Sequence, residues 1–173
     1  MVKVGINGFG RIGRLILRAL LENYKGKIQV VGINDLGSIE ANAHLIKFDS
    51  THGTLNHEVK TTKEGFQIGD QYIKVFAERD PSKLPWGKIG ADVVLECTGF
   101  FLDKKSAGKH IEAGAKKVII SAPAKEVDFT VVQGVNSKDL KKEHNVISNG
   151  SCTTNCLAPV AMVLENTFGI EYG

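Results

Sequence analysis

Cys152 stands in a short segment of small polar residues, Asn149–Cys156, where a packing cysteine would have apolar neighbours. The apolar run begins only after this segment, which places Cys152 in the first turn of an expected helix and Ser151 at its N-cap. Backbone N–H groups and the positive end of a helix dipole favour a thiolate at such a position. We therefore predict that Cys152 is a nucleophile. The Ser151 and Thr153 hydroxyls could hold a phosphate or a developing oxyanion beside it.

The two other cysteines carry weaker signals. We expect Cys97 and Cys156 to be packing residues, because cysteine is among the residue types most often buried. A metal site at the Cys152/Cys156 pair lacks a nearby pair of further ligands, so we predict no metal. Three cysteines cannot all pair with one another, and no secretory signal opens the chain. Reduced thiols in a cytoplasm are the expected state.

A second candidate site is the glycine-rich segment Gly8–Gly13, which has the spacing G-x-G-x-x-G. In a dinucleotide-binding turn, Gly8 would permit the sharp turn from strand to helix and Gly10 would let the backbone approach a pyrophosphate. Gly13 would let the helix pack closely on the strand, with the pyrophosphate against the helix N-terminus. By itself the pattern fits a plain structural turn about equally well, since the chain contains 19 glycines.

The position of Asp35 favours a dinucleotide-binding site over a plain structural turn. It lies about 20 residues after Gly13, at the end of the next expected strand, where dinucleotide-binding proteins place a ribose-binding acid. Its carboxylate would accept hydrogen bonds from ribose hydroxyls and repel a 2′-phosphate, so the sequence predicts NAD rather than NADP. Thr98–Gly99 and Ser121 follow two further expected strands and could contact the same cofactor. Ordinary turn chemistry explains either of those two sites alone nearly as well.

The elements that must position these residues alternate between strands and helices. A strand at 2–6, a helix from about 10 to 25 and a strand at 28–34 form a βαβ unit, which requires a parallel sheet. Helical spacing predicts a buried face made of Ile12, Leu15, Ile16, Ala19 and Leu20. The opposite, solvent face of this helix would carry Arg11, Arg14 and Arg18.

The rest of the chain continues the same pattern. We expect helices from Ser38 to about Phe48, from Asp103 to Gly114 and from Ser151 to Gly169, the last bent or delayed by Pro159. Strands are expected at 92–96, 117–121, 130–133 and 146–148, with an antiparallel insertion at 56–77. The predicted fold class is therefore α/β, with a Rossmann-type, doubly wound, mostly parallel sheet and a short antiparallel insertion.

Composition excludes several classes of function. The chain has 22 Lys and Arg residues against 19 Asp and Glu, spread along its length, which argues against a dedicated nucleic-acid partner. Its longest apolar stretch, 157–164, is far shorter than the roughly 20 residues that cross a bilayer, so we expect no membrane partner.

Motifs along nearly the whole chain resemble the N-terminal part of the phosphorylating, NAD-dependent glyceraldehyde-3-phosphate dehydrogenase family. The matching segments are Gly5–Arg14, Asn34–Asp35, Lys47, Asp49–Gly53, Glu78–Pro81, Leu84–Gly87, Thr98–Gly99, Ser121–Pro123 and Ser151–Pro159. At Cys97 and Gly150, where the family usually has small Ser and Ala, the chain exchanges one small residue for another.

The resemblance implies a reaction and a set of contacts. Cys152 would attack glyceraldehyde 3-phosphate to form a thiohemiacetal, hydride would pass to NAD, and inorganic phosphate would cleave the thioester to give 1,3-bisphosphoglycerate. Ser151 and Thr153 would bind phosphate. The implied cofactor contacts are Asn7, Gly8, Gly10, Arg11, Ile12, Gly13, Asp35, Arg79, Thr98, Gly99 and Ser121.

The resemblance also implies a division of the chain. Residues 1–150 would form the NAD-binding domain, and residues 151–173 the nucleophile-bearing helix leading to a catalytic domain that supplies a histidine base. We therefore expect a poorly active fragment of a parent that forms a homotetramer. Two alternatives stay open. One is a fragment of the related erythrose-4-phosphate dehydrogenase, and the other is a non-catalytic NAD-binding or interaction module.

Overall fold

The computed structural model describes residues 1–173, and its main feature is a nine-stranded sheet of order β10-β11-β9-β8-β1-β2-β7-β6-β5. Its parallel pairs join β1 (Val2–Asn7), β2 (Ile28–Asn34), β7 (Gln71–Phe76), β8 (Val93–Glu96), β9 (Lys117–Ile120), β10 (Phe129–Thr130) and β11 (Val146–Ser148). Antiparallel strands β5 (Val59–Thr62) and β6 (Gly65–Ile68) extend the edge beyond β7. A separate antiparallel pair joins β3 (Phe48–Asp49) and β4 (Gly53–Thr54). The predicted fold class is confirmed.

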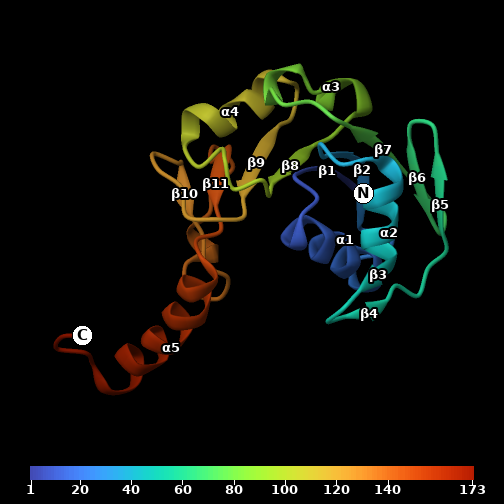
Figure 1. Cartoon of the computed structure of the whole chain (residues 1–173). Coiled ribbons are helices and arrows are strands. Elements are labelled where there is room, and N and C mark those ends of the chain that lie inside the picture. The colour runs from blue at the N-terminus through green and yellow to red at the C-terminus, as the bar shows by residue number, and fades with distance from the viewer.

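Helices connect the strands and cover both faces of the sheet. They are α1 (Arg11–Asn23), α2 (Ile39–Lys47), α3 (Trp86–Ile89), α4 (Lys104–Glu112) and α5 (Cys152–Phe168), with 3₁₀ turns η1 (Pro81–Lys83) and η2 (Ser137–Asp139). Figure 1 shows α3 and α4 on one face of the sheet and α1 on the other. None of these helices is long and apolar enough to cross a bilayer.

The hydrophobic core is divided by the sheet. The larger cluster packs α1 and α2 against the strands, with Leu17 and Ile46 among its fully buried members. On the opposite face Trp86, also fully buried, lies directly on β1 and β2. The close approach depends on Gly5, where an added Cβ would lie 2.6 Å from the indole ring. The two clusters together fix the positions of β1, β2 and β8, the strands that carry the glycine-rich segment and its neighbours.

The predicted faces of α1 are correct only in part. Leu15, Ile16 and Leu20 are half-buried, Leu20 packs against the core, and Arg11 is exposed as expected. Ile12 and Ala19 are exposed, whereas Leu17 and Leu21 are buried against the sheet. Arg18, expected in solvent, is 5% exposed. Its guanidinium donates to the carbonyl oxygens of Ile46 at 2.8 Å and of Lys47 at 3.2 Å, and also to Gly53. The cation therefore satisfies carbonyl groups that the end of α2 leaves without helical partners.

The strand expected at 130–133 is shorter and begins earlier. Only Phe129 and Thr130 form β10, and the chain then turns away, although the Val131 N–H still donates to the Ser148 carbonyl at 2.8 Å. The insertion at 56–77 contains the expected antiparallel strands. Its last strand, β7, also pairs in parallel with β2, which the alternating pattern did not reveal.

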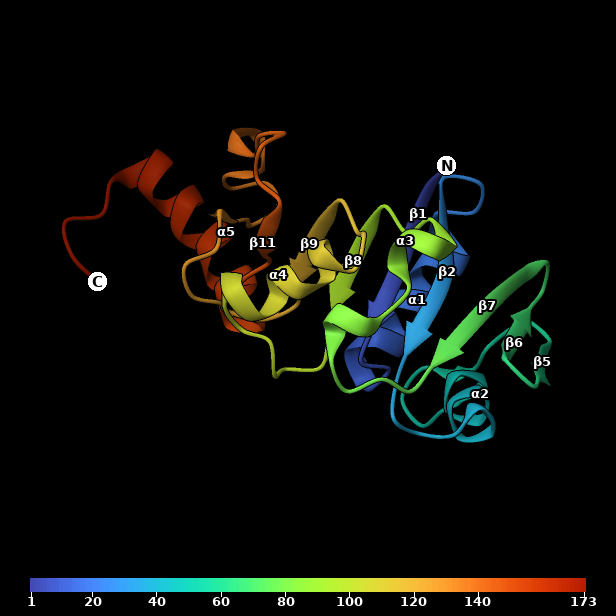
Figure 2. The same cartoon turned by 90° about the horizontal axis from the view of Figure 1, so that it is seen from above.

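α5 begins and ends where the sequence predicts, but its surroundings differ from the expectation. Pro159 lies inside it without delaying its start, and none of its residues is buried. Figure 2 shows the helix leading away from the sheet towards the C-terminus. Cys156, expected to pack, is therefore exposed, because no other part of the chain covers this helix. The exposed apolar side chains on it are Leu157, Val160, Val163, Leu164 and Phe168.

Candidate functional site

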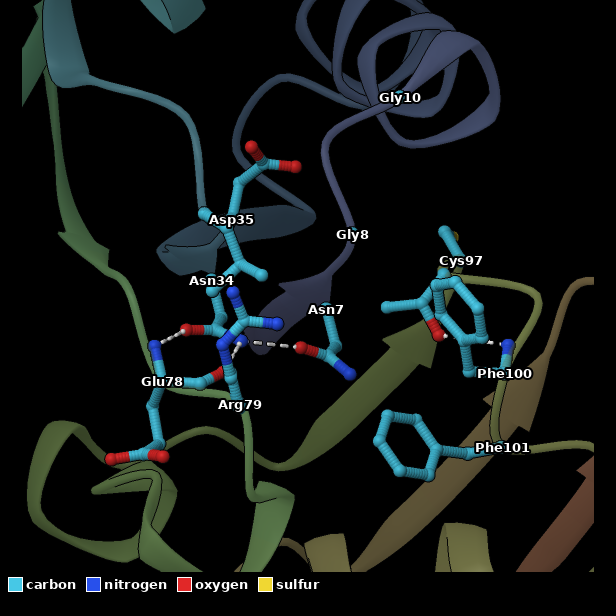
Figure 3. Close-up of a pocket in the computed structure, with 12 residues that line it drawn as sticks. Asn7, Gly8, Gly10, Asn34, Asp35, Glu78, Arg79, Cys97, Phe100 and Phe101 are labelled. Atoms are coloured by element: carbon cyan, nitrogen blue, oxygen red, sulfur yellow. Dashed lines mark hydrogen bonds between the residues drawn. The ribbon is translucent and has the colours of Figure 1, made fainter.

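A pocket of about 500 Å³ opens at the carboxyl ends of β1, β2, β7 and β8. Ligands of open parallel sheets bind at this edge. Figure 3 shows Asp35, Glu78 and Arg79 on one side of Gly8 and Asn7, with Phe100 and Phe101 on the other. The lining residues are Asn7, Gly8, Gly10, Asn34, Asp35, Leu36, Glu78, Arg79, Cys97, Thr98, Phe100 and Phe101.

The glycine-rich segment forms the turn between β1 and α1. Gly8 has a φ of +88°, which favours glycine, and an added Cβ would lie 2.7 Å from the Thr98 nitrogen. At Gly13 a Cβ would clash with the Gly8 carbonyl oxygen, so the absence of a side chain lets α1 approach the turn. Gly10 is the N-cap of α1, and an added Cβ there would meet no protein atom within 4 Å. The helix N-terminus therefore faces open space in the pocket.

Asp35 holds this turn as well as bordering the pocket. Its Oδ2 accepts the backbone N–H of Phe9 at 2.8 Å, and its Oδ1 accepts that of Gly37 at 2.8 Å. Each carboxylate oxygen keeps a further acceptor site for a ligand hydroxyl.

The opposite wall follows β8. The Thr98 hydroxyl accepts the Phe100 N–H at 3.1 Å, and the Phe100 side chain is 84% exposed at the pocket edge. Cys97 packs against the core, as expected, and is half-buried because it also lines the pocket. Burial raises the pKa of the Cys97 thiol to about 11, and the neighbouring Glu96 adds to this rise against a hydrogen bond from Ser121 that lowers it. Cys97 is thus a poor nucleophile.

Arg79 reaches the pocket because β7 runs parallel to β2, so that the two strands end at the same edge. The side chain of Asn34 hydrogen-bonds to the backbone of Glu78, in the segment that follows β7. Its Oδ1 accepts the Glu78 N–H and its Nδ2 donates to the Glu78 carbonyl, both at 2.8 Å. Figure 3 shows this bridge beside Arg79.

Cys152 is the first residue of α5 and is exposed. Ser151 caps the helix, with its hydroxyl accepting the Thr154 N–H at 2.9 Å and lying 2.8 Å from the Thr153 hydroxyl. Upstream, the Gly150 N–H donates to the Ser148 hydroxyl at 3.0 Å, which ties the turn to the end of β11. The geometry is that of a helix N-terminus with an accessible thiol and two adjacent hydroxyls.

The structure does not bring every expected site residue to the pocket surface. Ser151, Cys152 and Thr153 do not line it, but they follow β11, whose carboxyl end lies at the same sheet edge. The strand order places them three strands from β1, a separation of about 15 Å. The remaining expected residues outside the lining are Arg11, Ile12, Gly13, Gly99 and Ser121.

Arg11 has a partner within the protein. Its guanidinium lies 2.5 Å from Asp49, whose other oxygen accepts the N–H groups of Thr51 and His52. Those backbone hydrogen bonds, first that of His52, hold the pKa of Asp49 well below its usual range. The Arg11 side chain is therefore fixed by an ion pair, and its backbone N–H stays at the start of α1.

Sequence reasoning missed six residues of the pocket lining. They are Asn34, Leu36, Glu78, Cys97, Phe100 and Phe101. A simple signal was available, because all of them lie at or within five residues of the carboxyl ends of strands β2, β7 and β8. No group of three or more potential metal-ligating side chains is clustered anywhere in the chain.

Comparison with known proteins identifies the family. Residues 2–104 match the model described as "Glyceraldehyde 3-phosphate dehydrogenase, NAD binding domain", and residues 151–173 match the model of that family's C-terminal domain. Glyceraldehyde-3-phosphate dehydrogenase of Xanthobacter flavus is 55% identical over 99% of this chain and 51% of its own length. The enzyme of Geobacillus stearothermophilus is 57% identical over 99% of this chain and 51% of its own length. Glyceraldehyde-3-phosphate dehydrogenase 1 of Bacillus subtilis is 56% identical over the same shares of the two chains.

The chain thus spans about half the length of the curated relatives it matches. The resemblance found in the motifs is confirmed over the whole chain, and NAD is the cofactor that the matched family model names. The chain belongs to the glyceraldehyde 3-phosphate dehydrogenase family and contains its NAD-binding domain.

Proposed function

We propose that the pocket beside the glycine-rich turn binds NAD and that Cys152 is the nucleophile of a phosphorylating aldehyde dehydrogenase acting on glyceraldehyde 3-phosphate. The observation that carries this proposal is the shared sheet edge. The accessible thiol follows β11, and the pocket follows β1, β2, β7 and β8 at the same end of the parallel strands. A carbonyl carbon bound between the two sites could meet both the thiolate and the cofactor.

The pocket fits a dinucleotide. The open space in front of Gly10 and the N–H groups of Arg11 and Ile12 suit a pyrophosphate at the start of α1. Asp35 suits the adenosine ribose, and its negative charge disfavours a 2′-phosphate. Further contacts are assigned to Arg79 on the adenine side. The other proposed contacts are Asn7 on the pocket floor, Thr98 on the wall that follows β8, and Gly99 and Ser121 beyond the lining.

The chemistry of the chain itself centres on Cys152. Its thiolate would form a bond to the aldehyde carbon, and the resulting oxyanion would take a proton or a hydrogen bond from nearby donors. NAD supplies the acceptor for the hydride that leaves this carbon. Inorganic phosphate then displaces the sulfur, giving the acyl phosphate and regenerating the thiolate. Ser151 and Thr153, whose hydroxyls adjoin the helix N-terminus, are proposed to hold phosphate.

The proposed domain division lies near residue 150. Residues 1–150 hold the sheet and the pocket, and residues 151–173 form the helix that begins the catalytic part, in accord with the two family matches. The three free cysteines suit a reducing compartment, so a cytoplasmic location belongs to the proposal. Assembly of the longer protein into a homotetramer rests on the family resemblance alone.

Trapping of the acyl intermediate tests the proposed reaction. The chain is incubated with NAD and glyceraldehyde 3-phosphate without inorganic phosphate, then digested and analysed by mass spectrometry. We expect a phosphoglyceroyl thioester on the Cys152 peptide that disappears on addition of phosphate and is absent in Cys152→Ser. An adduct on Cys156 instead would contradict the assignment. Faster adduct formation with erythrose 4-phosphate would favour the related erythrose-4-phosphate dehydrogenase.

A non-catalytic interaction module is the second candidate, because the exposed apolar side chains of α5 form a surface suited to association. Such a module need not form any adduct at Cys152. The trapping experiment therefore separates it from the enzyme.

A further inference from the structure

A buried chain of polar side chains lies behind the pocket wall, and the reaction above gives it no role. It runs from Trp86 in α3 through His110 in α4 to Glu96 at the end of β8. Trp86 Nε1 donates to His110 Nδ1 at 2.9 Å, and His110 Nε2 lies 3.0 Å from Glu96 Oε2. His110 is 0% and Glu96 1% exposed, so neither group is solvated. Burying them is costly unless every polar atom is hydrogen-bonded.

The indole of Trp86 fixes the tautomer of His110. An indole N–H can only donate, so His110 Nδ1 must accept and carries no proton. The ring proton is then on Nε2 and is donated to Glu96. Asn7 Nδ2 lies 3.4 Å from the same Nε2, but two donors face each other there and form no hydrogen bond. His110 is therefore neutral, with its single proton directed at the carboxylate.

Glu96 accepts four hydrogen bonds, the number that the two oxygens of an ionised carboxylate offer. Oε2 accepts from His110 and from Asn7 Nδ2, the latter at 2.6 Å. Oε1 accepts the Thr98 backbone N–H at 2.7 Å and the Thr98 hydroxyl at 2.5 Å. The carboxylate thus holds Asn7 on β1, His110 on α4 and Thr98 in the turn after β8.

The residues that Glu96 holds belong to both walls of the pocket. Thr98 lies on one wall, and its hydroxyl orients the turn by accepting the Phe100 N–H. Asn7 connects to the other wall through Asn34. The Asn7 Oδ1 accepts a hydrogen bond from Asn34 Nδ2 at 2.7 Å, and Asn34 in turn hydrogen-bonds to the backbone of Glu78. Figure 3 shows Asn7 linked to Asn34 and Asn34 to Glu78 across the pocket floor.

We propose that His110 and Glu96 are positioning residues for the NAD site: the neutral imidazole, locked by Trp86, orients the Glu96 carboxylate that sets the spacing between the two pocket walls. The inference rests on the proposed function, since it assumes that this pocket binds NAD. Neither side chain lines the pocket itself, so both act through Thr98 and Asn7.

Two substitutions at His110 distinguish its proposed hydrogen-bonding role from a purely structural role as a buried side chain. His110→Leu removes both the acceptor for Trp86 and the donor to Glu96. His110→Gln keeps one of each, an amide oxygen for the indole and an amide N–H for the carboxylate. Ile68→Val is the control for general loss of stability, because Ile68 is fully buried on β6, which β2 and β7 separate from β1. NAD affinity is measured by calorimetry and the exchange rate of the Thr98 amide by NMR.

Losing a hydrogen bond to a buried charge predicts a fall in NAD affinity of about tenfold or more in His110→Leu. Exchange of the Thr98 amide should be faster in the same variant. We expect His110→Gln to recover most of the affinity, and Ile68→Val to leave both quantities unchanged. Glu96→Gln should lower affinity at least as much, because its amide N–H₂ must face two donors that the carboxylate now satisfies. It also provides the test if His110→Leu does not fold.

Nitrogen-15 NMR of the wild-type imidazole supplies a readout that does not depend on NAD. A protonated Nε2 and an unprotonated Nδ1 are expected, and a proton on Nδ1 would overturn the proposal. Wild-type binding of NAD together with unchanged affinity in His110→Leu or Glu96→Gln would overturn only the positioning role. A wild-type chain that does not bind NAD would instead overturn the proposed cofactor site, while the tautomer and the Thr98 exchange rate still show whether the network exists.

Discussion

The Asp35 carboxylate, at the end of β2, accepts the Phe9 backbone N–H at 2.8 Å and so ties the second strand to the glycine-rich turn after the first. The same carboxylate accepts the Gly37 N–H at 2.8 Å through its other oxygen. One side chain therefore fixes the shape of the turn and presents a negative charge to the pocket.

Replacing Asp35 tests both roles. Asp35→Asn keeps one acceptor oxygen but turns an N–H₂ group towards a backbone N–H, and it removes the charge. We expect NAD affinity to fall about tenfold, from a loss of roughly 1–2 kcal/mol, and the preference for NAD over NADP to shrink. Calorimetry with both cofactors measures the change. Asp139→Asn, at an exposed position in η2, serves as the control, and an equal fall in that variant would argue against a specific role for Asp35.

Two glycines in the same turn should respond differently to alanine. At Gly13 the added Cβ collides with the Gly8 carbonyl, so Gly13→Ala should lose about 1–3 kcal/mol of unfolding free energy. At Gly10 the Cβ meets no protein atom, so Gly10→Ala should cost less than about 1 kcal/mol, mainly through poorer helix capping. We expect Gly10→Ala nonetheless to weaken NAD binding at least tenfold, because the methyl group occupies the pyrophosphate space. Urea unfolding and calorimetry check the pair, and normal NAD affinity in Gly10→Ala would refute the assignment of that space.

The three thiols should react with iodoacetamide in a fixed order. Cys152 should label first at neutral pH, since it is exposed at the first turn of α5, and Cys156 should follow because it is exposed one turn later. Burial raises the pKa of Cys97 to about 11, so its labelling should become appreciable only as the pH approaches that value. Peptide mass spectrometry against time and pH measures all three rates. In Cys152→Ser, fast labelling should be lost while the slower Cys156 reaction persists; fastest labelling of Cys97 at pH 7 would contradict this account.

Asp128 should contribute stability that acid removes. Lys104 lies 2.6 Å from its Oδ1, and with the Val146 and Asn145 N–H groups it lowers the pKa of Asp128 to about 2. A carboxyl whose pKa is lower in the folded than in the unfolded chain stabilises the fold above the unfolded value, near 4, and loses this effect as the pH falls towards 2. Asp128→Asn should therefore be less stable than wild type at pH 6, with the difference shrinking as the pH falls below about 4 and vanishing below pH 2.

Denaturant unfolding at a series of pH values measures that difference. Asp70→Asn, in the exposed turn between β6 and β7, is the matched control and should show little difference at any pH. A stability gap between Asp128→Asn and wild type that stays constant from pH 6 to pH 2 would contradict the ion-pair explanation.

Local patterns were enough to predict the elements around the site. The turn at Gly8–Gly13, the strand ending at Asn34 and the cap at Ser151 each depend on residues within one or two turns of chain, so their spacing carries the information. The resemblance to a family supplied Arg79, which no spacing rule indicated. The structure explains its position by the parallel pairing of β7 with β2.

Features set by distant residues could not be predicted in the same way. Arg18 looks like a solvent-facing arginine in α1, because the carbonyl groups that bind it come from the end of α2 and from Gly53. The Glu96 network joins β1, β8, α3 and α4, whose proximity follows only from the assembled sheet. Cys156 is expected to pack because cysteine is a residue type that is often buried, but no residue of α5 is buried in this structure, and this exposure depends on how the rest of the chain folds.

A crystal structure of the chain with NAD tests the central claim most directly. The account predicts the pyrophosphate against the N–H groups that follow Gly10, the adenosine ribose hydrogen-bonded to Asp35, and the nicotinamide directed along the sheet edge towards Cys152. A dinucleotide bound elsewhere on the protein, or one whose nicotinamide points away from Cys152, would contradict it.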